Sequence, residues 1–325
     1  MSPHYSIAIQ IVTYNNQHTI DVCLKSLEKQ TFRDYVVCFI DNNSQDKTVS
    51  VAKKHAVNIL IQNKVNIGYA AGHNQAVRMT KSNYVLTLNP DVVLDKDFLK
   101  NMVEAMDTAG DTIGSASGLL LRINTIHEKS GIVDSAGLFM RKNRRQGLRY
   151  EGTSSTLVQK GTEQIFGPDG AAAFYRRKML EDIKIGNQYF DEDFFMHKED
   201  VDICWRAQLR GWKSLFVPSA ACYHIRSFRS DKRQQMQPFL KTCAVRNRYY
   251  LIIKNDKITH ILKDFFPIAF YDLGIFFYLL LFERSSLVAY IDVVKNFKTM
   301  MEKRKIIQSR AIASYNDIAR WFTQS

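Results

Sequence analysis

The stretch TLNPDVVLD, residues 87–95, joins the end of an apolar strand to a carboxylate. The fold class predicted below follows from this junction and from the strands and helices on either side of it. Residues 84–88 are apolar except for Thr87, so they predict a short buried strand. Asn89, Pro90 and Asp91 form a turn signal, and apolar residues resume at once. A carboxylate directly after a buried strand needs either a structural or a chemical explanation.

The sequence on both sides of this stretch alternates between apolar strands and helices. Strands are predicted over residues 6–13, 35–40 and 57–61, and helices over residues 19–30, 48–55, 73–80 and 97–109. Continuous apolar strands are typical of a parallel sheet whose two faces are covered by helices. We therefore predict an α/β protein with a mostly parallel central sheet, followed from residue 237 to residue 325 by a helical C-terminal extension.

In such a sheet, ligands bind beyond the carboxyl ends of the strands. Thr13, Asp41 and Asp91 each lie at the carboxyl end of a predicted strand. Asp41 is suited to accept the imide N–H of uracil or thymine, although a turn or helix-capping aspartate gives the same pattern. The glycines of NIGYAAGHN, residues 66–74, allow a nucleotide to approach the backbone, but the pattern is neither a dinucleotide-binding fingerprint nor a P-loop.

Asp91 is also a candidate ligand of a metal ion. A hard divalent cation takes oxygen ligands from a few carboxylates and from a diphosphate. Asn89 can orient the Asp91 carboxylate, and a simple turn is the alternative. His224 follows the last short strand and is a second candidate ligand, with a structural role as its alternative. Basic residues that can neutralise a diphosphate follow it: Arg226, Arg229, Lys232 and Arg233.

Residues 191–212, DEDFFMHKEDVDICWRAQLRGW, crowd six carboxylates around two phenylalanines. A helix beginning at Glu199 places Asp200 in its first turn, where the helix dipole stabilises negative charge. Arg206 lies one turn after Asp202 and can pair with it. A carboxylate at such a position beside a cleft is a plausible general base for a sugar hydroxyl, whereas an acidic helix start on a solvated face is the alternative.

Composition limits the other classes of function. The net charge of +13 favours acidic partners, but no nucleic-acid-binding motif accompanies it, so we expect no nucleic acid partner. The five cysteines are widely spaced and lack a C-x-x-C pair, which favours reduced, buried thiols. The N-terminal residues lack the pattern of a signal peptide, so a cytoplasmic location is expected.

The most apolar segment is FFPIAFYDLGIFFYLLLF, residues 265–282, which is flanked by basic residues. We interpret it as a lipid-facing helical hairpin at the membrane surface. A helix packed on the core and a true membrane span are the alternatives. The basic run at residues 141–149 is interpreted as a mobile loop.

In order along the chain, the motifs IVTYNN, DNNSQD, NIGYAAGHN, LNPDVVL, GPDGAAAFYRR and FDEDFFMHKEDVDICWRAQLRGW resemble those of family 2 glycosyltransferases. The resemblance covers about residues 5–250 and is to the bacterial rhamnosyltransferase-like branch. It implies the GT-A fold, a Rossmann-like nucleotide-diphospho-sugar transferase domain over residues 1–236, and inverting transfer with Asp200 as the catalytic base. It also implies Mg²⁺ or Mn²⁺ at Asp91, with His224 as a looser ligand. The nucleotide-sugar site would comprise Thr13, Tyr14, Asn15, Asp41, Asn66, Gly68, Asn74, Asn89, Gly170 and Arg206.

The family's D-x-D metal motif is reduced here to N-P-D, with Asn89 in place of its first aspartate. The resemblance favours dTDP-L-rhamnose as donor, with UDP-sugars as an alternative. It favours a glycan or polyprenyl-diphosphate-linked acceptor in bacterial cell-surface synthesis, at the cytoplasmic face of the membrane. A degenerate nucleotide-sugar-binding protein without turnover is the remaining alternative, and the oligomeric state stays open.

Overall fold

The computed structural model describes residues 4–125, 128–225, 233–234 and 236–322. Its strands are β1 (Tyr5–Thr13), β2 (Tyr35–Asp41), β3 (Ile59–Gln62), β4 (Ser82–Leu88), β5 (Val92–Leu94), β6 (Ile113–Thr125), β7 (Glu128–Ser135), β8 (Leu138–Met140), β9 (Gln146–Leu148), β10 (Glu163–Ile165), β11 (Ala172–Arg176) and β12 (Lys213–His224). All of them except β8 and β9 belong to one sheet in the order β10-β12-β6-β11-β4-β1-β2-β3, with β5 beside β12 and β7 beside β6.

The helices divide into those that flank the sheet and those that follow it. The flanking helices are α1 (Ile20–Glu28), α2 (Thr48–Ala52), α3 (Tyr69–Met79), α4 (Phe98–Thr108), α5 (Arg177–Ile183) and α6 (Glu199–Leu209), with short 3-10 turns η1 (Ser155–Leu157) and η2 (Glu192–Phe194). The later elements are α7 (Pro238–Asn255), α8 (Ile258–Lys263), α9 (Phe265–Phe282), η4 (Arg284–Leu287), α10 (Val288–Lys295), α11 (Phe297–Ser309) and α12 (Tyr315–Ala319).

The parallel sheet predicted from the apolar strands is present in the first half of the chain. β3, β2, β1 and β4 pair in parallel, and the register sets Thr13 opposite Asp41 at their carboxyl ends. The second half is mixed, because β11 runs antiparallel to both β4 and β6. β11 was not predicted, since a short apolar run that continues directly into a helix cannot be separated from that helix by periodicity.

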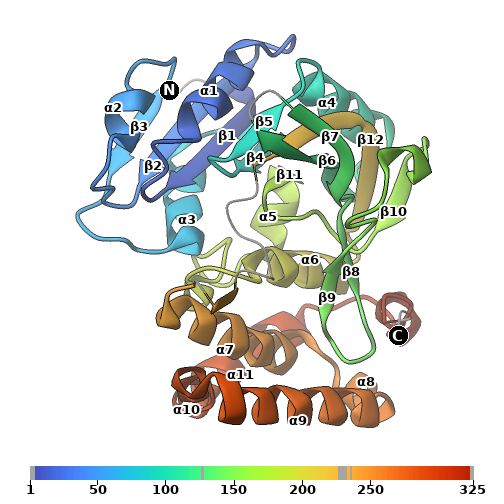
Figure 1. Ribbon diagram of the computed structural model, residues 1–325. Coiled ribbons are helices and arrows are strands. Elements are labelled where there is room, and N and C mark those ends of the chain that lie inside the picture. The colour runs from blue at the N-terminus through green and yellow to red at the C-terminus, as the bar shows by residue number, and fades with distance from the viewer. Residues whose placement is uncertain (1–3, 126–127, 226–232, 235, 323–325) are drawn as a thin grey trace.

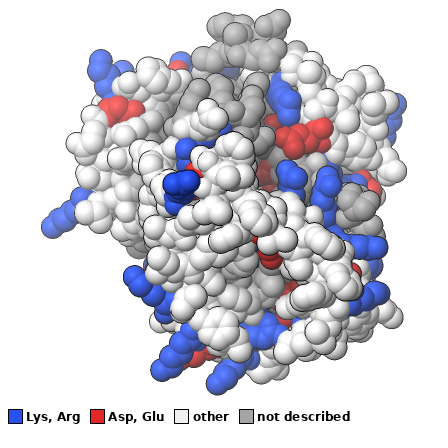
Figure 2. All heavy atoms as spheres, turned by 60° about the horizontal axis from the view of Figure 1, so that its bottom comes forward, with Lys and Arg blue, Asp and Glu red and all other residues white. Residues whose placement is uncertain are grey.

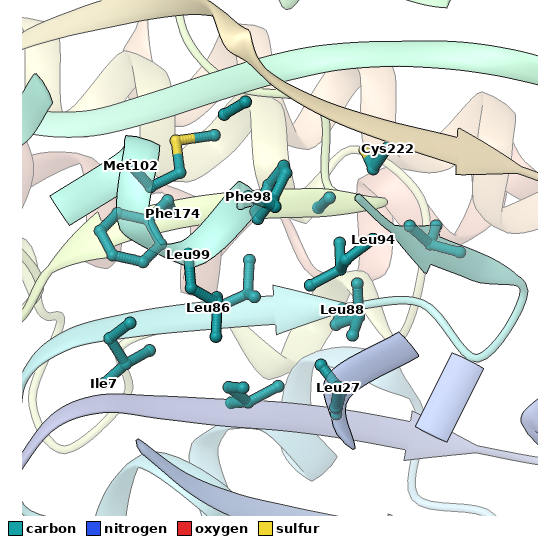
Figure 3. Packing of buried hydrophobic residues seen from close by; sticks show 14 of the residues in the cluster. Ile7, Leu27, Leu86, Leu88, Leu94, Phe98, Leu99, Met102, Phe174 and Cys222 are labelled. Carbon is teal, nitrogen blue, oxygen red and sulfur yellow. The ribbon is translucent and has the colours of Figure 1, made fainter. Parts of the chain in front are cut away.

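Helices cover the two faces of the sheet with separate apolar layers. On one face, Leu27 of α1 and Phe98, Leu99 and Met102 of α4 pack on the sheet in one cluster, which includes Leu86 of β4 (Figure 3). On the other face, α3, α5 and α6 pack in a second cluster. Burying apolar side chains on both faces explains why the strands read as continuous apolar runs.

The C-terminal helices form a further layer beneath α6 (Figure 1). The predicted boundary at residue 237 coincides with the start of α7 at Pro238. The core nevertheless crosses this boundary, because Trp205 of α6 shares one buried cluster with Tyr250 of α7 and Met300 of α11. The sheet domain and the helical extension are therefore packed as one unit across α6.

Two sequence interpretations need correction. The basic run at residues 141–149 includes the turn between β8 and β9, and its Arg144 is 2% exposed, with Nε 2.7 Å from Asp256 and an NH group 2.8 Å from Asp264. A buried, doubly paired arginine fixes this turn, contrary to the expected mobile loop. Residues 265–282 form the single helix α9 rather than both arms of a hairpin, and η4 then leads the chain into α10.

Candidate functional site

The carboxyl ends of β1 and β2 form the first wall of the candidate site. The Thr13 hydroxyl donates to Asp41 Oδ1 at 3.3 Å, and the Ser44 backbone N–H donates to Asp41 Oδ2 at 3.0 Å. Tyr14 is exposed, and Asn15 accepts a hydrogen bond from the backbone N–H of Gln45 at 2.8 Å. These contacts bring Thr13, Tyr14, Asn15 and Asp41 together as predicted and hold the Asp41 carboxylate in a fixed orientation.

The loop before α3 joins this wall to the segment that precedes α6. Asn66 Oδ1 accepts the Gly68 N–H at 2.9 Å, and Gly68 has φ of 89°, which favours glycine. A Cβ at Gly68 would lie 2.6 Å from the Phe195 ring, and the Tyr69 N–H donates to the Phe195 carbonyl at 2.7 Å. Gly68 is therefore required both by its backbone angle and by this close approach.

Asp91 lies beside His224, as strand pairing between β5 and β12 dictates. His224 Nε2 is 3.3 Å from Asp91 Oδ1, and its Nδ1 is 2.8 Å from Asp134 Oδ2. Burial alone would lower the pKa of His224, but hydrogen bonds to Asp134 and Asp91 raise it to about 10. The sequence reasoning identified Asp91 and His224 but missed Asp134, which orients the imidazole.

This group can hold a divalent metal ion, whose binding would displace the proton that the two carboxylates favour on His224. A histidine that binds a metal commonly donates its other ring N–H to a carboxylate, which is the relation between His224 and Asp134. Within the described ranges, no three His, Cys, Asp or Glu side chains gather to hold a metal by themselves. One carboxylate and one imidazole leave positions for diphosphate oxygens, which supply part of the coordination of Mg²⁺ in nucleotide sites.

A hydrogen-bonded chain connects Asn89 to Asp200 across the site. The Tyr69 hydroxyl lies 3.1 Å from Asn89 Oδ1 and 3.0 Å from the Gly170 carbonyl. The Gly170 N–H donates to Asp200 Oδ2 at 3.1 Å. A Cβ at Gly170 would lie 3.2 Å from the Cβ of Asp200, so glycine lets the two segments approach. Asn89, Gly170 and Asp200 are thus brought together as predicted.

Two neighbouring carboxyl groups at the start of α6 have raised pKa values. Burial, and then the charge of Asp169, raises the pKa of Asp200 to about 6. Burial, and then the charge of Asp200, raises the pKa of Glu199 to about 8. Near neutral pH, Asp200 is therefore ionised and Glu199 is largely protonated. Asp169 was not singled out from the sequence, because only folding brings it and its neighbour Gly170 close to Asp200.

Asn74 and Arg206 occupy buried structural positions. Asn74 is 0% exposed, and its side chain bonds to the backbone of residues 189–190 through both its oxygen and its nitrogen. Arg206 is 2% exposed and pairs with Asp202 at 2.8 Å, as its helical spacing predicted. Its other two nitrogens donate to backbone carbonyls at 2.6 and 2.8 Å. All three of its nitrogens are thus bonded within the protein, and the bonds of both residues serve the packing of the segment before α6.

The segment before Asp200 has an unusual backbone that α7 supports. Phe195, His197 and Lys198 have φ values of 61°, 69° and 72°, in the left-handed region. Such residues cost energy and persist where their surroundings hold them. The Asn247 side-chain amide donates to the carbonyls of Phe194, Met196 and His197 at 2.9, 2.9 and 2.8 Å. Asn247 of α7 therefore fixes the segment that carries Asp200.

A comparison with family models identifies the chain. The model described as glycosyl transferase family 2 matches residues 8–184, which is more than half of the 325 residues. The chain belongs to glycosyl transferase family 2. The family predicted from the motifs is thereby confirmed, whereas the rhamnosyltransferase-like branch remains a prediction.

Curated relatives match only part of their own length. The poly-beta-1,6-N-acetyl-D-glucosamine synthases of Staphylococcus aureus and Staphylococcus epidermidis are each 24% identical over 230 residues, covering 67% of this chain and 50% of theirs. This family 2 chain therefore spans about half the length of these relatives.

Solved structures share the fold at low sequence identity. S. aureus TarS has a TM-score of 0.59 at 18% identity, covering 94% of this chain and 50% of TarS. GalNAc-T7 with UDP, GalNAc and Mn²⁺ has a TM-score of 0.60 at 14% identity, covering 77% of this chain and 48% of the other. The Pyrobaculum calidifontis mannosyltransferase PcManGT with GDP-Man and Mn²⁺ has a TM-score of 0.54 at 15% identity, covering 95% and 86%. The predicted GT-A fold class is confirmed.

Part of the predicted site lies outside the residues that the structure describes. Arg226, Arg229 and Lys232, the candidates for neutralising a diphosphate, lie outside the described ranges. Arg233 is described, and its guanidinium pairs with the Glu283 carboxylate at 2.7 Å. This pairing occupies Arg233 at the junction of α9 and η4.

Proposed function

We propose that this family 2 protein is an inverting glycosyltransferase that uses a uracil or thymine nucleotide sugar. The observation that carries the proposal is the chain of contacts from Asn89 through Tyr69 and Gly170 to Asp200. These contacts support the proposal, because they join the Asp200 carboxylate to Asn89 at the end of β4. Asp41, held by Thr13 and Ser44, is the proposed acceptor of the base imide N–H.

In the proposed reaction, Asp200 accepts the proton of an acceptor hydroxyl as its oxygen attacks the anomeric carbon. The bond between that carbon and the diphosphate oxygen breaks, and the nucleoside diphosphate leaves with the bonding electrons. The configuration inverts, and no covalent intermediate with the protein forms. Asp91 and His224 are the proposed ligands of a divalent metal ion, which would supply positive charge for the departing diphosphate.

The donor sugar has two candidates that the base-recognition site alone does not separate. The motif resemblance favours dTDP-L-rhamnose. S. aureus TarS, which shares this fold, was crystallised with UDP-GlcNAc, and the curated relatives are named as N-acetylglucosamine polymer synthases. Asp41 is suited to both bases, because uracil and thymine present the same imide N–H. We retain dTDP-L-rhamnose as the first donor to test and UDP-GlcNAc as the second.

A thermal unfolding panel tests the nucleotide site directly. dTDP and UDP are expected to raise the melting temperature, because they bind only the folded protein. ADP, GDP and CMP are not, because their bases do not present the imide N–H of uracil and thymine to Asp41. EDTA and the substitution Asp91→Asn are each expected to reduce the shift. Absence of any nucleotide-dependent shift would contradict the proposal, and an EDTA-resistant shift would remove the metal from it.

The pH dependence of transfer follows from Asp200. The base must be ionised, so kcat/KM is expected to rise with pH through about 6 and to level off above it. The charge of Asp169 contributes to the raised pKa, so Asp169→Asn is expected to move this rise to lower pH. Initial rates at constant ionic strength measure both profiles. A rate that is flat through this region would contradict the role of Asp200 as base.

We also propose that α9 docks this enzyme on the cytoplasmic face of a membrane. By length and composition, α9 is one helix apolar enough to cross a membrane, and 11% of it is buried. Its exposed side chains include Phe266 at 69% and Phe270 at 71%. Figure 2, turned toward the C-terminal helices, shows a surface with few charges at its centre and Lys and Arg toward its margins. This pattern suits an interfacial helix.

Vesicle binding tests this docking surface. The double substitution Phe266→Ser and Phe270→Ser is expected to weaken binding to anionic vesicles by about 100-fold or more, because burying each ring contributes about 1.5–3 kcal/mol. The matched control is Val65→Ser with Leu157→Ser, which changes exposed apolar residues far along the chain from α9. Equal binding of the two double variants would contradict the assignment.

A further inference from the structure

Three cationic side chains lie close together where the segment before α6 meets α7 and the β8–β9 turn. They are Lys198, two residues before Asp200, Arg145 in the turn between β8 and β9, and Arg248 in α7. Lys198 is partly buried, and burial, followed by the charges of Arg248 and Arg145, lowers its pKa to about 8 against the opposing charges of Asp200 and Glu199. Positive charge is thus concentrated here rather than dispersed.

Two of these cations have no partner in the described part of the chain. Neither the Lys198 ammonium nor the Arg145 guanidinium makes a hydrogen bond or ion pair with any described residue. Arg248, by contrast, donates to Asp272 of α9 at 2.8 Å and to the Asn143 carbonyl at 2.5 Å. Lys198 and Arg145 are thus held near Arg248 without a direct ion pair of their own among the described residues, and an anionic ligand would relieve the repulsion among the three cations.

The fold holds this group in place from both sides. Lys198 has a left-handed backbone, and Asn247 of α7 bonds to the carbonyl of the preceding residue at 2.8 Å. Arg145 follows Arg144, whose buried pairs with Asp256 and Asp264 anchor the β8–β9 turn at the ends of α7 and α9. Two independent supports therefore bring the cations to the boundary between the proposed base and the exposed apolar helix.

We propose that Lys198 and Arg145, flanked by Arg248, bind the phosphate or diphosphate group of a lipid-linked acceptor. The inference rests on the proposed function and names its acceptor class. An acceptor of this class has a sugar hydroxyl, an anionic linkage and an apolar chain in that order. The same order is found here in Asp200, the cation group and α9. Charge-assisted hydrogen bonds from ammonium and guanidinium groups are the strong contacts for such oxygens.

Flotation with vesicles tests this site on the full chain. Vesicles of phosphatidylcholine carry either a long-chain polyisoprenyl diphosphate or phosphatidylglycerol at equal charge. The unaltered protein is expected to bind the diphosphate vesicles about ten-fold or more tightly, and millimolar inorganic pyrophosphate is expected to compete. The variant K198Q with R145Q is expected to lose this preference while keeping its binding to phosphatidylglycerol vesicles, since each charged contact is worth about ten-fold.

Controls separate this site from the donor site and from misfolding. The matched double variant K53Q with K54Q removes the same charge from exposed positions near α2 and is expected to keep the preference. R145Q alone alters an exposed side chain, so it carries the test if K198Q unfolds. UDP affinity is expected to be unchanged in all variants.

Three results would overturn the inference. They are no diphosphate preference in the unaltered protein, a preference retained by K198Q with R145Q, or an equal loss of UDP affinity, which would assign the cations to the donor. Failure of the proposed function would appear in a different measurement, as the absence of nucleotide binding by the unaltered protein. The vesicle comparison therefore tests the anion site whether or not the protein binds a nucleotide.

Discussion

Replacing Asp200 by Asn is expected to lower kcat for sugar transfer by about 10²–10⁴-fold, the usual contribution of a general base. Nucleotide binding is expected to persist, because the residues proposed to hold the base and diphosphate lie on other elements. The asparagine oxygen can still accept the Val201 N–H, which lies 2.7 Å from Asp200 Oδ1. Its amide cannot accept the Gly170 N–H, so a small loss of stability is expected as well.

Glu199→Gln is the matched control for this substitution. Glu199 is adjacent to Asp200 and largely protonated near neutral pH, because its pKa is raised to about 8 by burial and by the charge of Asp200. A neutral carboxylic acid cannot serve as the base, so Gln is expected to keep transfer within about ten-fold. Single-turnover rates and dTDP or UDP affinities measure both variants. Loss of transfer in Glu199→Gln with activity retained in Asp200→Asn would exchange the two roles.

The different pKa values of these adjacent carboxyl groups have a structural origin. Both lie in the first turn of α6, but Asp200 accepts two backbone N–H bonds, from Gly170 and Val201, which stabilise its charged form. Glu199 Oε2 is buried without a hydrogen-bond partner among the described residues, which favours the protonated form. One short segment thus presents an ionised and a neutral carboxyl side by side, a pattern associated with acid–base sites.

The parts of the site that the sequence predicted are those set by local rules. Thr13, Asp41 and Asp91 were predicted at strand ends, because the sheet order places carboxyl ends at one edge. Asp200 was predicted at a helix start, and the pairing of Arg206 with Asp202 followed from helical spacing. In each case, the position of the residue within its own strand or helix could be predicted from the residues next to it in the sequence.

The parts that the sequence did not predict depend on contacts between distant segments. Asp134 reaches His224 across 90 residues, and Asn247 reaches Phe194 across 53 residues. No periodicity links such positions, since β7 and α7 acquire their places only when the sheet and the C-terminal layer assemble. Distant contacts also explain why the sequence suggested a diphosphate contact for Arg206. Its residue type suits a diphosphate, but its buried position is set by α5 and the segment before η2.

Replacing Lys254 by Met is expected to lower the free energy of unfolding by about 3–5 kcal/mol, the cost of breaking a buried ion pair. Lys254 of α7 is 0% exposed and contacts two carboxylates that are also 0% exposed, Asp191 and Asp202, the latter at 2.9 Å. Lys303 of α11 adds a second contact to Asp191 at 2.5 Å. Methionine fills the space but leaves the buried carboxylates short of one positive charge. Denaturant unfolding followed by far-UV circular dichroism measures the change.

Two comparisons test whether this network joins the C-terminal helices to the catalytic half. Lys25→Met removes the same charge from an exposed pair with Asp21, where the lysine side chain is 56% exposed, and is expected to cost under about 1 kcal/mol. Adding Asp191→Asn to Lys254→Met is expected to recover part of the lost stability, because it removes a buried charge that has lost a partner. If Lys254→Met costs no more than Lys25→Met, the buried network contributes little to the joint, and the apolar contacts of Trp205 with α7 and α11 would have to hold the two halves together.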